Sequence, residues 1–180
     1  GAPVSRHARR QKALMQQLIP PNTFTPGARR AGVVGAFGTS LLTVMYAVTL
    51  AVGLSSLESP QQPIVDPHFS LLEILILLLM PLTVMLFAAV HAWAPAEAKV
   101  LSLIALVFAG LLAGLTCSVH FTILAVGRHP AFAELAWTPL VLSFTWPSIA
   151  YALDILAWDV FFALAALFAA PVFSGSRLAN

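Results

Sequence analysis

The fold is decided by a stretch near the C-terminus, Pro147 to Phe173, which reads PSIAYALDILAWDVFFALAALFAAPVF. The stretch exceeds the roughly 20 apolar residues that an α-helix needs to cross the hydrocarbon core of a bilayer. It also contains two carboxylates, Asp154 and Asp159. Because a charge at membrane depth costs at least about 2.5 kcal/mol, such residues normally face protein or water and usually have a function. The stretch therefore predicts a transmembrane helix that carries a candidate site.

Composition extends this prediction to the whole chain. Of the 180 residues, 59% are hydrophobic and only 9% are charged, whereas roughly a quarter of the residues in a soluble globular domain are charged. Three more apolar runs of bilayer length precede the C-terminal one and leave no room for a separate soluble domain. The single cysteine, Cys117, excludes an intramolecular disulfide. The composition therefore excludes a soluble globular domain and a disulfide-bonded scaffold.

We expect an all-α integral membrane protein, a four-transmembrane-helix bundle that forms one membrane domain over residues 31–180. A further apolar segment, Pro130 to Trp146, is interrupted by Pro130 and Pro139 and contains Trp137. Such a segment is typical of an interfacial or re-entrant piece that precedes the last helix. The predicted helices span residues 31–54, 71–93, 100–126 and 147–170.

Glycines in the first and third predicted helices indicate close helix packing. Gly32, Gly35 and Gly38 recur through the first helix, and Gly110 and Gly114 stand in GxxxG spacing in the third. Small residues let helices approach each other in lipid, where packing rather than hydrophobicity holds helices together.

The distribution of basic residues predicts the topology. Six of the nine Lys and Arg residues precede residue 31, and residues 1–30 contain no acid. This basic arm is typical of an interfacial segment that lies on an anionic membrane surface. Placing the arm, Lys99 and Arg177 on one side leaves Arg128 alone on the other. The positive-inside rule then predicts that the N- and C-termini are both cytoplasmic.

Two stretches carry a resemblance to known proteins. His91 to Phe121 reads HAWAPAEAKVLSLIALVFAGLLAGLTCSVHF, and Tyr151 to Phe173 reads YALDILAWDVFFALAALFAAPVF. Both resemble uncharacterised small multi-pass membrane proteins of bacteria, of the domain-of-unknown-function kind. The resemblance covers the C-terminal half of the chain. It implies a location in the bacterial inner membrane, and it implies no activity.

Three ionisable residues are expected at one depth in the outer leaflet. At a rise of 1.5 Å per residue, Asp154 lies about 10 Å below the outer boundary and His120 about 9 Å below it, if their helices end near Pro147 and Val126. Glu73 lies about one turn into the second helix. We therefore expect the three to meet around a cavity roofed by the segment from 130 to 146. They are the candidate catalytic residues.

Candidate ligand-binding residues are expected near this cluster. Tyr151 and Trp158 share a helical face with Asp154. Their rings would stabilise a developing positive charge on a ligand. Trp146 and Cys117 complete the candidate set.

A structural interpretation competes with the functional one. Asp154 and Asp159 can be held by polar side chains of neighbouring helices and specify packing, a role usually worth about 1 kcal/mol or less per contact. Asp159 lies about 140° round an ideal helix from Asp154, so we expect it to make a different contact. Glu73 can reach headgroup water, His120 can be a neutral hydrogen-bonded imidazole, and Cys117 can be a small buried apolar residue.

We expect no cofactor and no metal. The sequence contains no P-loop, no glycine-rich dinucleotide turn and no serine-hydrolase elbow. Haem held by two histidines needs both at one depth, and His91 and His120 are expected near opposite membrane faces. Only Cys117 and His120 have metal-ligand spacing, which supplies two ligands at most. The basic arm is better explained by a membrane surface than by nucleic acid.

Three functions remain open. The first is an accessory subunit that binds membrane lipids and associates with a protein partner or with itself. The second is an enzyme in which Asp154, with Glu73 or His120, protonates an alkene or epoxide of a lipophilic small molecule that is isoprenoid- or sterol-like. The third is a small proton-coupled carrier in which Asp154 takes up and releases the proton.

Overall fold

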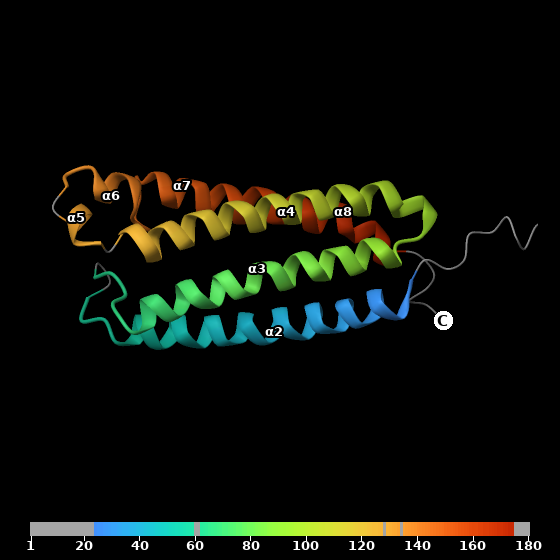
Figure 1. Cartoon of the computed structure of the whole chain (residues 1–180), viewed down its shortest axis with the longest axis horizontal. Coiled ribbons are helices and arrows are strands. Elements are labelled where there is room, and N and C mark those ends of the chain that lie inside the picture. The colour runs from blue at the N-terminus through green and yellow to red at the C-terminus, as the bar shows by residue number, and fades with distance from the viewer. Residues whose placement is uncertain (1–23, 60–61, 128, 134, 175–180) are drawn as a thin grey trace, which may run out of the picture.

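The computed structural model describes residues 24–59, 62–127, 129–133 and 135–174. Within these residues, four helices are long and apolar enough to cross a membrane, and they lie side by side as a bundle (Figure 1). The same residues contain no strand. The predicted fold class, an all-α four-helix bundle of the multi-pass membrane type, is confirmed. Most of the basic arm, Arg128 and Arg177 lie outside the described residues.

The first three spans are joined by short connections. Helix α2 covers Pro26–Ser55 and α3 covers His68–Trp93. A 3-10 turn, η1 over Ala96–Ala98, leads into α4 over Lys99–Thr122. The third span continues past α4 as a π-helical turn, η2 over Ile123–Gly127.

The chain from α4 to the last span does not cross the bundle. It contains only the short helices α5, Pro130–Ala133, and α6, Thr138–Val141, which lie together at one end of the bundle (Figure 1). The fourth span then consists of α7 over Ile149–Ile155, the π-helical η3 over Leu156–Phe162 and α8 over Ala163–Phe173. An interfacial or re-entrant segment before the last helix was expected, and two four-residue helices fit that description.

The first helix begins at Pro26, five residues before the expected start of the first span at residue 31. Thr25 caps the helix, because its hydroxyl accepts a hydrogen bond from the backbone N–H of Ala28 at 3.2 Å. Proline at the first helical position has no N–H to satisfy and a backbone angle suited to a helix. Arg29 and Arg30 therefore belong to α2.

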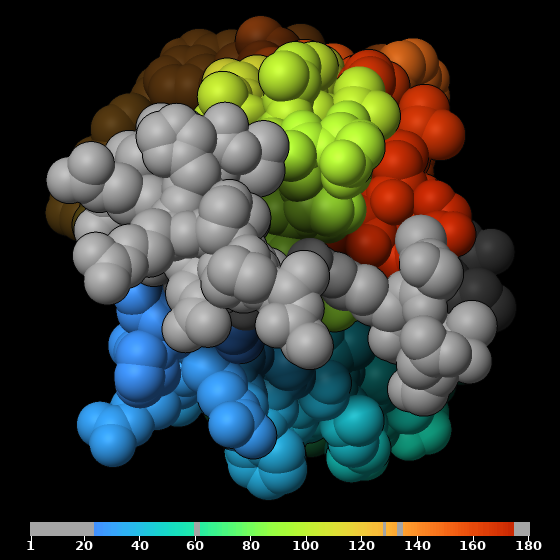
Figure 2. All heavy atoms as spheres, turned by 90° about the vertical axis from the view of Figure 1, so that its right-hand side faces the viewer, coloured from blue at the N-terminus to red at the C-terminus, as the bar shows by residue number. Residues whose placement is uncertain are grey.

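The start of α2, the turn between α3 and α4 and the end of α8 lie next to each other at one end of the bundle (Figure 2). Arg29, Arg30 and Lys99 consequently share this end. Which side of the membrane the end faces stays a prediction from the charge distribution.

Helix α2 is held almost entirely by α3. Its glycines allow this, because a Cβ on Gly35 would lie 2.8 Å from the backbone nitrogen of Leu86, and one on Gly38 would lie 2.8 Å from a methyl of Leu82. The expected close packing of the first span is confirmed. The third span shows no such packing among the described residues, because a Cβ on Gly110 or Gly114 would meet nothing within 4 Å.

A gap consequently separates α2 from the fourth span. Helix α4 packs against α3 and the fourth span, whereas α2 makes extensive contact with α3 only. Just 6% of the most apolar 18-residue window of α2 is buried within the protein. The first span therefore packs against α3 with one face, and its other faces are exposed to lipid or to the gap.

The π-helical stretch η3 turns the face of the fourth span. Ala157 and Ala165 are both fully buried, at 0% exposure. In a regular α-helix two residues eight positions apart would differ by about 80° in direction. The wider turns of η3 absorb this difference and keep both alanines on the inner face. π-Bulges of this kind are frequent at functional sites.

Candidate functional site

Three spans bring Glu73, His120 and Asp154 together. The imidazole Nδ1 of His120 lies 2.8 Å from Oε2 of Glu73, and its Nε2 lies 3.3 Å from Oδ1 of Asp154. The expected approach of these three residues is confirmed. Their roles in catalysis stay predictions.

The depth of each residue follows from its distance to a helix end. Glu73 lies five residues after His68, which begins α3, and Asp154 lies five residues after Ile149, which begins α7. His120 lies near the end of α4. This end of α4 lies next to the starts of α3 and α7, because the spans alternate in direction. The sequence positions alone therefore place the three side chains at one level.

The three side chains become more exposed from Glu73 through His120 to Asp154. The Glu73 side chain is 4% exposed and that of His120 is 6% exposed, whereas Asp154 is 22% exposed. The idea that Glu73 reaches headgroup water is wrong, because α3 turns it inward among α4 and its neighbours. Glu73 is the buried end of the chain of contacts, and Asp154 is the accessible end.

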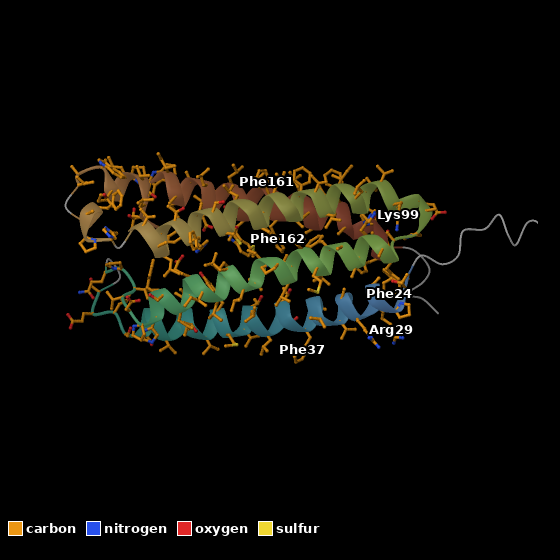
Figure 3. The ribbon with its side chains drawn as sticks, viewed as in Figure 1. Phe24, Arg29, Phe37, Lys99, Phe161 and Phe162 are labelled. Carbon is orange, nitrogen blue, oxygen red and sulfur yellow. The ribbon has the colours of Figure 1, made fainter. Side chains whose placement is uncertain are left out.

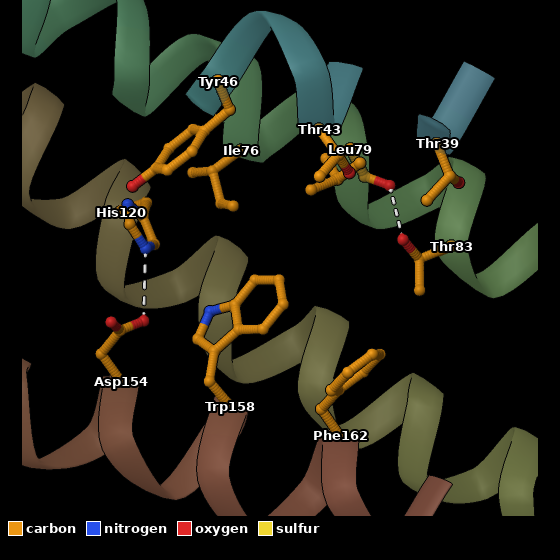
Figure 4. Close-up of a pocket in the computed structure, with 10 residues that line it drawn as sticks. All are labelled: Thr39, Thr43, Tyr46, Ile76, Leu79, Thr83, His120, Asp154, Trp158 and Phe162. Carbon is orange, nitrogen blue, oxygen red and sulfur yellow. Dashed lines mark hydrogen bonds and ion pairs between the residues drawn. The ribbon is translucent and has the colours of Figure 1, made fainter. Parts of the chain in front are cut away.

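A cavity of about 510 Å³ lies beside Asp154, in the gap between α2 and the fourth span (Figure 4). Tyr46 from α2 and Trp158 from η3 point into it from opposite sides, with His120 at one end. Apolar and aromatic groups make up most of the wall. The lining residues are Thr39, Thr43, Tyr46, Ile76, Leu79, Thr83, His120, Asp154, Trp158 and Phe162.

Three threonines, Thr39, Thr43 and Thr83, form a second polar region of the cavity wall. Thr83 donates its hydroxyl to the backbone carbonyl of Leu79 at 3.0 Å. The buried hydroxyl of Thr39 has no hydrogen-bond partner among the described residues. An unpaired buried hydroxyl is costly, so Thr39 leaves one unsatisfied polar atom at this end of the cavity.

The candidate ligand-binding residues divide into one that lines the cavity and three that do not. Trp158 is part of the wall. Trp146 is 71% exposed, because it precedes Pro147 outside the start of α7. Cys117 packs against the apolar core around Met80 and Leu112. Tyr151 is partly buried and is not part of the wall.

The predicted roof is also only partly present. Phe144, from the segment before α7, packs against the His120 ring with their centroids 5.0 Å apart. This contact covers the histidine on the side of the short helices. The residues that line the cavity all belong to the four spans, so the segment covers the histidine rather than the cavity.

Sequence reasoning missed the contribution of the first span. Thr39, Thr43 and Tyr46 all line the cavity, and their spacing of four and three residues places them on one helical face. This spacing of polar groups in an otherwise apolar helix was the available signal. The first span was interpreted only through its glycines.

Two carboxylates on opposite sides of one imidazole can hold a mobile proton. If the imidazole is protonated, both its N–H groups donate, one to Glu73 and one to Asp154. If Nδ1–H donates to Glu73 and Nε2 is bare, a protonated Asp154 donates to Nε2. The two arrangements differ only in the position of one proton between His120 and Asp154. The site can therefore deliver a proton at the cavity wall and take it back.

The second histidine of the spans is far from this site. Nδ1 of His91 lies 2.9 Å from the hydroxyl of Ser102, and the carbonyl of His91 accepts from the Lys99 ammonium at 2.6 Å. These contacts lie at the opposite end of the bundle, beside the turn from α3 to α4 (Figure 3). The expected separation of His91 from His120 is confirmed.

Among the described residues, no group of three or more His, Cys, Asp and Glu side chains could hold a metal ion. Comparison with known proteins finds no matching family model, no matching curated protein and no matching solved structure. The function is therefore argued from the geometry of the site.

Proposed function

We propose that this chain is an integral-membrane enzyme that isomerises a lipophilic alkene or epoxide by proton transfer. The observation that carries the proposal is the chain of contacts from Glu73 through His120 to Asp154, which ends at the wall of a largely apolar cavity. General acid–base groups must lie within hydrogen-bond reach of the proton they move. Here the accessible carboxyl group is backed by a second proton carrier and a buried carboxylate that orients it.

Each residue has a distinct role in this mechanism. Asp154 donates its proton to an alkene carbon or an epoxide oxygen, which leaves a carbocation in the cavity. The faces of Tyr46 and Trp158 stabilise that cation. Loss of a proton from a neighbouring carbon forms the new double bond, and Asp154 takes that proton up. The product is an isomer of the substrate, and no co-reactant is needed.

His120 and Glu73 act through Asp154 as positioning residues. Glu73 accepts a hydrogen bond from Nδ1 and so fixes the orientation of the imidazole, in the way that a carboxylate orients the base of a catalytic triad. His120 then holds the Asp154 carboxyl in place through Nε2. When Nε2 carries a proton and donates it to Oδ1, the other oxygen of Asp154 carries the proton that is donated to the substrate.

The shape of the cavity supports a lipophilic substrate. A volume of about 510 Å³ lies within the range of roughly 300–1,000 Å³ that is usual for small-molecule sites. The cavity lies in the gap beside α2, which packs along α3 only. A molecule dissolved in the bilayer can enter between α2 and the fourth span. An isoprenoid- or sterol-like substrate fits these conditions.

Deuterium uptake tests the proposal directly. The purified protein is placed in nanodiscs in D2O with lipid extracted from the membranes that produced it, supplemented with a defined set of isoprenoid alkenes and epoxides. Protonation followed by loss of a different proton gives a deuterated isomer, detected by mass spectrometry. We expect the rate to fall by about 10²–10⁴ in Asp154→Asn, as when a general acid is removed.

Asp159→Asn is the matched control, because it changes the same residue type on the same helix away from the cavity. The control should exchange at the wild-type rate. Failure of the wild-type protein to form any deuterated isomer, or equal exchange by Asp154→Asn, would reject the enzyme.

The accessory-subunit hypothesis is supported by a different part of the molecule. Asp159 is exposed on the surface of the fourth span, which favours a protein partner at that surface. This function does not exclude the first, since an enzyme can also associate with a partner. The carrier hypothesis requires access to Asp154 from both membrane faces and stays a prediction.

A further inference from the structure

Asp159 lies near the middle of the fourth span. It is ten residues after Ile149 and fourteen before Phe173, the two ends of the span. At 1.5 Å per residue the first distance is about 15 Å, which is half the thickness of the hydrocarbon core. An aspartate side chain is too short to reach headgroup water from this depth, unlike the long stems of lysine and arginine.

The Asp159 carboxyl group faces away from the bundle. It is exposed, and no hydrogen bond or ion pair joins it to any other described residue. Neighbours one turn away on its own helix, Ile155, Leu156 and Ala163, are all apolar. Asp159 therefore finds no polar partner within the described part of the chain.

The surface around Asp159 also suits close approach of another helix. Exposed residues follow Asp159 every three or four positions into α8, and they are alanines. Alanines let a second helix come near enough for its side chains to reach the carboxylate. We call this surface the outward face, and its residues are Asp159, Ala163, Ala166 and Ala170.

We propose that the outward face docks a transmembrane helix of a partner protein that presents a lysine or arginine side chain near the middle of the bilayer. Charge complementarity selects this occupant. Intramembrane carboxylates are kept where they pair with an opposite charge or another polar group. A cationic side chain at the same depth meets the requirement of Asp159, and the alanines give it access.

A second copy of this chain fits the outward face less well. Among the described residues, Arg29, Arg30 and Lys99 lie at one end of the spans. His91 lies at that same end, and His120 is buried and already contacts two carboxylates. The described surface thus offers no cation at the depth of Asp159, which favours a different protein as the partner.

Defined peptides provide the test. The labelled full-length protein is reconstituted in phosphatidylcholine vesicles with a synthetic leucine–alanine transmembrane helix that carries one lysine at its centre. An otherwise identical helix with leucine at the centre is the comparison. Energy transfer between labels reports association. We expect roughly tenfold tighter association with the central-lysine helix, the size of a strong interhelical polar contact.

Three variants assign that preference to one residue. Asp159→Leu should remove it, and Asp159→Asn, which keeps the shape and loses the charge, should weaken it. Asp154→Asn, on the cavity side of the same helix, should keep it in full. Circular dichroism confirms that each variant is helical.

Equal association with the two peptides overturns the proposal, as does a preference that survives Asp159→Leu. Energy transfer between two labelled copies of the protein without peptide, lost in Asp159→Leu, overturns it in favour of a second copy. None of these outcomes depends on the exchange reaction at Asp154, so the two proposals can fail separately.

Discussion

Asp154 and Asp159 stand five residues apart in the fourth span, but they have opposite surroundings. Asp154 lines the cavity 3.3 Å from the imidazole of His120, whereas Asp159 is exposed on the outward face. The residue type and the apolar sequence context are the same for both. What differs is the direction in which the helix turns each side chain. In a membrane bundle, that direction decides whether a carboxylate meets polar groups inside the protein or lies on its outer surface.

The glycines in the small-residue patterns of α2 and α4 differ in the same way, because those of α2 face a neighbouring helix and those of α4 face outward. Gly35 on the inner face of α2 lies against the backbone of α3, whereas Gly114 in α4 would give a Cβ nothing to touch within 4 Å. Both belong to small-residue patterns of the kind that predicts helix packing. Only the first pattern is used within the chain. Patterns of small or charged residues therefore identify contact surfaces without showing which partner makes the contact.

The largest expected effect comes from breaking the inner cluster at its buried end. Glu73→Ala leaves the His120 imidazole without its partner at 2.8 Å, and removal of one member of a buried pair typically costs 3–5 kcal/mol. We expect a loss of about 3 kcal/mol in the free energy of unfolding, measured by steric trapping in bicelles. Glu58→Ala is the control, because Glu58 is exposed in the loop after α2. Equal stability of the two variants would show that the contact adds nothing to folding.

Replacing each aspartate with leucine should separate the two carboxylates most clearly. In an insertion assay on the isolated fourth span, Asp154→Leu and Asp159→Leu should each favour insertion by about 2 kcal/mol, since both remove a charge from the apolar segment. In the folded protein the two should differ. Asp154→Leu removes the contact with His120 and lowers stability, whereas Asp159→Leu removes no contact and leaves stability unchanged or higher. A loss of stability in Asp159→Leu would indicate an internal contact.

A methyl group added to each glycine makes a finer test. Gly35→Ala forces a Cβ to within 2.8 Å of the Leu86 nitrogen, so α2 must shift away from α3. Overpacking of this kind typically costs 1–3 kcal/mol. Gly114→Ala meets open space and should change the free energy of unfolding by less than about 0.5 kcal/mol. Steric trapping of both variants measures the difference, and a costly Gly114→Ala would mean that another chain covers α4 in the sample.

The depth of the site residues in the membrane was predictable from the sequence, whereas the direction in which their side chains point was not. The level of Glu73, His120 and Asp154 follows from their distances to the span ends and from the rise per residue. The face that each helix turns to its neighbours is set by packing. The glycine contacts of α2 orient Tyr46 toward the cavity, and the π-helical η3 changes the direction of everything after Ile155.

The ligand-binding candidates show the same limit. Tyr151 and Trp158 both share an ideal helical face with Asp154. In the structure, Trp158 lines the cavity, whereas Tyr151 and Cys117 are not part of the cavity wall. A rule based on ideal spacing cannot separate these cases, because the width of the cavity depends on how far α2 lies from the fourth span.

The smallest change with a clear consequence is Thr39→Val, which keeps the shape of the side chain and removes only the hydroxyl. Because the Thr39 hydroxyl is buried without a partner in the described structure, its removal should leave stability unchanged or raise it by about 1 kcal/mol. The matched control is Thr49→Val on the same helix, where the hydroxyl donates to the carbonyl of Met45 at 2.8 Å and lies outside the cavity wall.

If the cavity binds a molecule with a polar group at each end, Thr39→Val should weaken its binding about threefold to tenfold, the size of one neutral hydrogen bond. Thr49→Val should leave binding unchanged. The binding of each variant is measured with a photoreactive isoprenoid alcohol in nanodiscs. Mass spectrometry then quantifies its crosslinking to the cavity wall. Unchanged crosslinking in Thr39→Val would restrict recognition to the end of the cavity that holds Asp154. The substrate would then have one polar group and an apolar remainder.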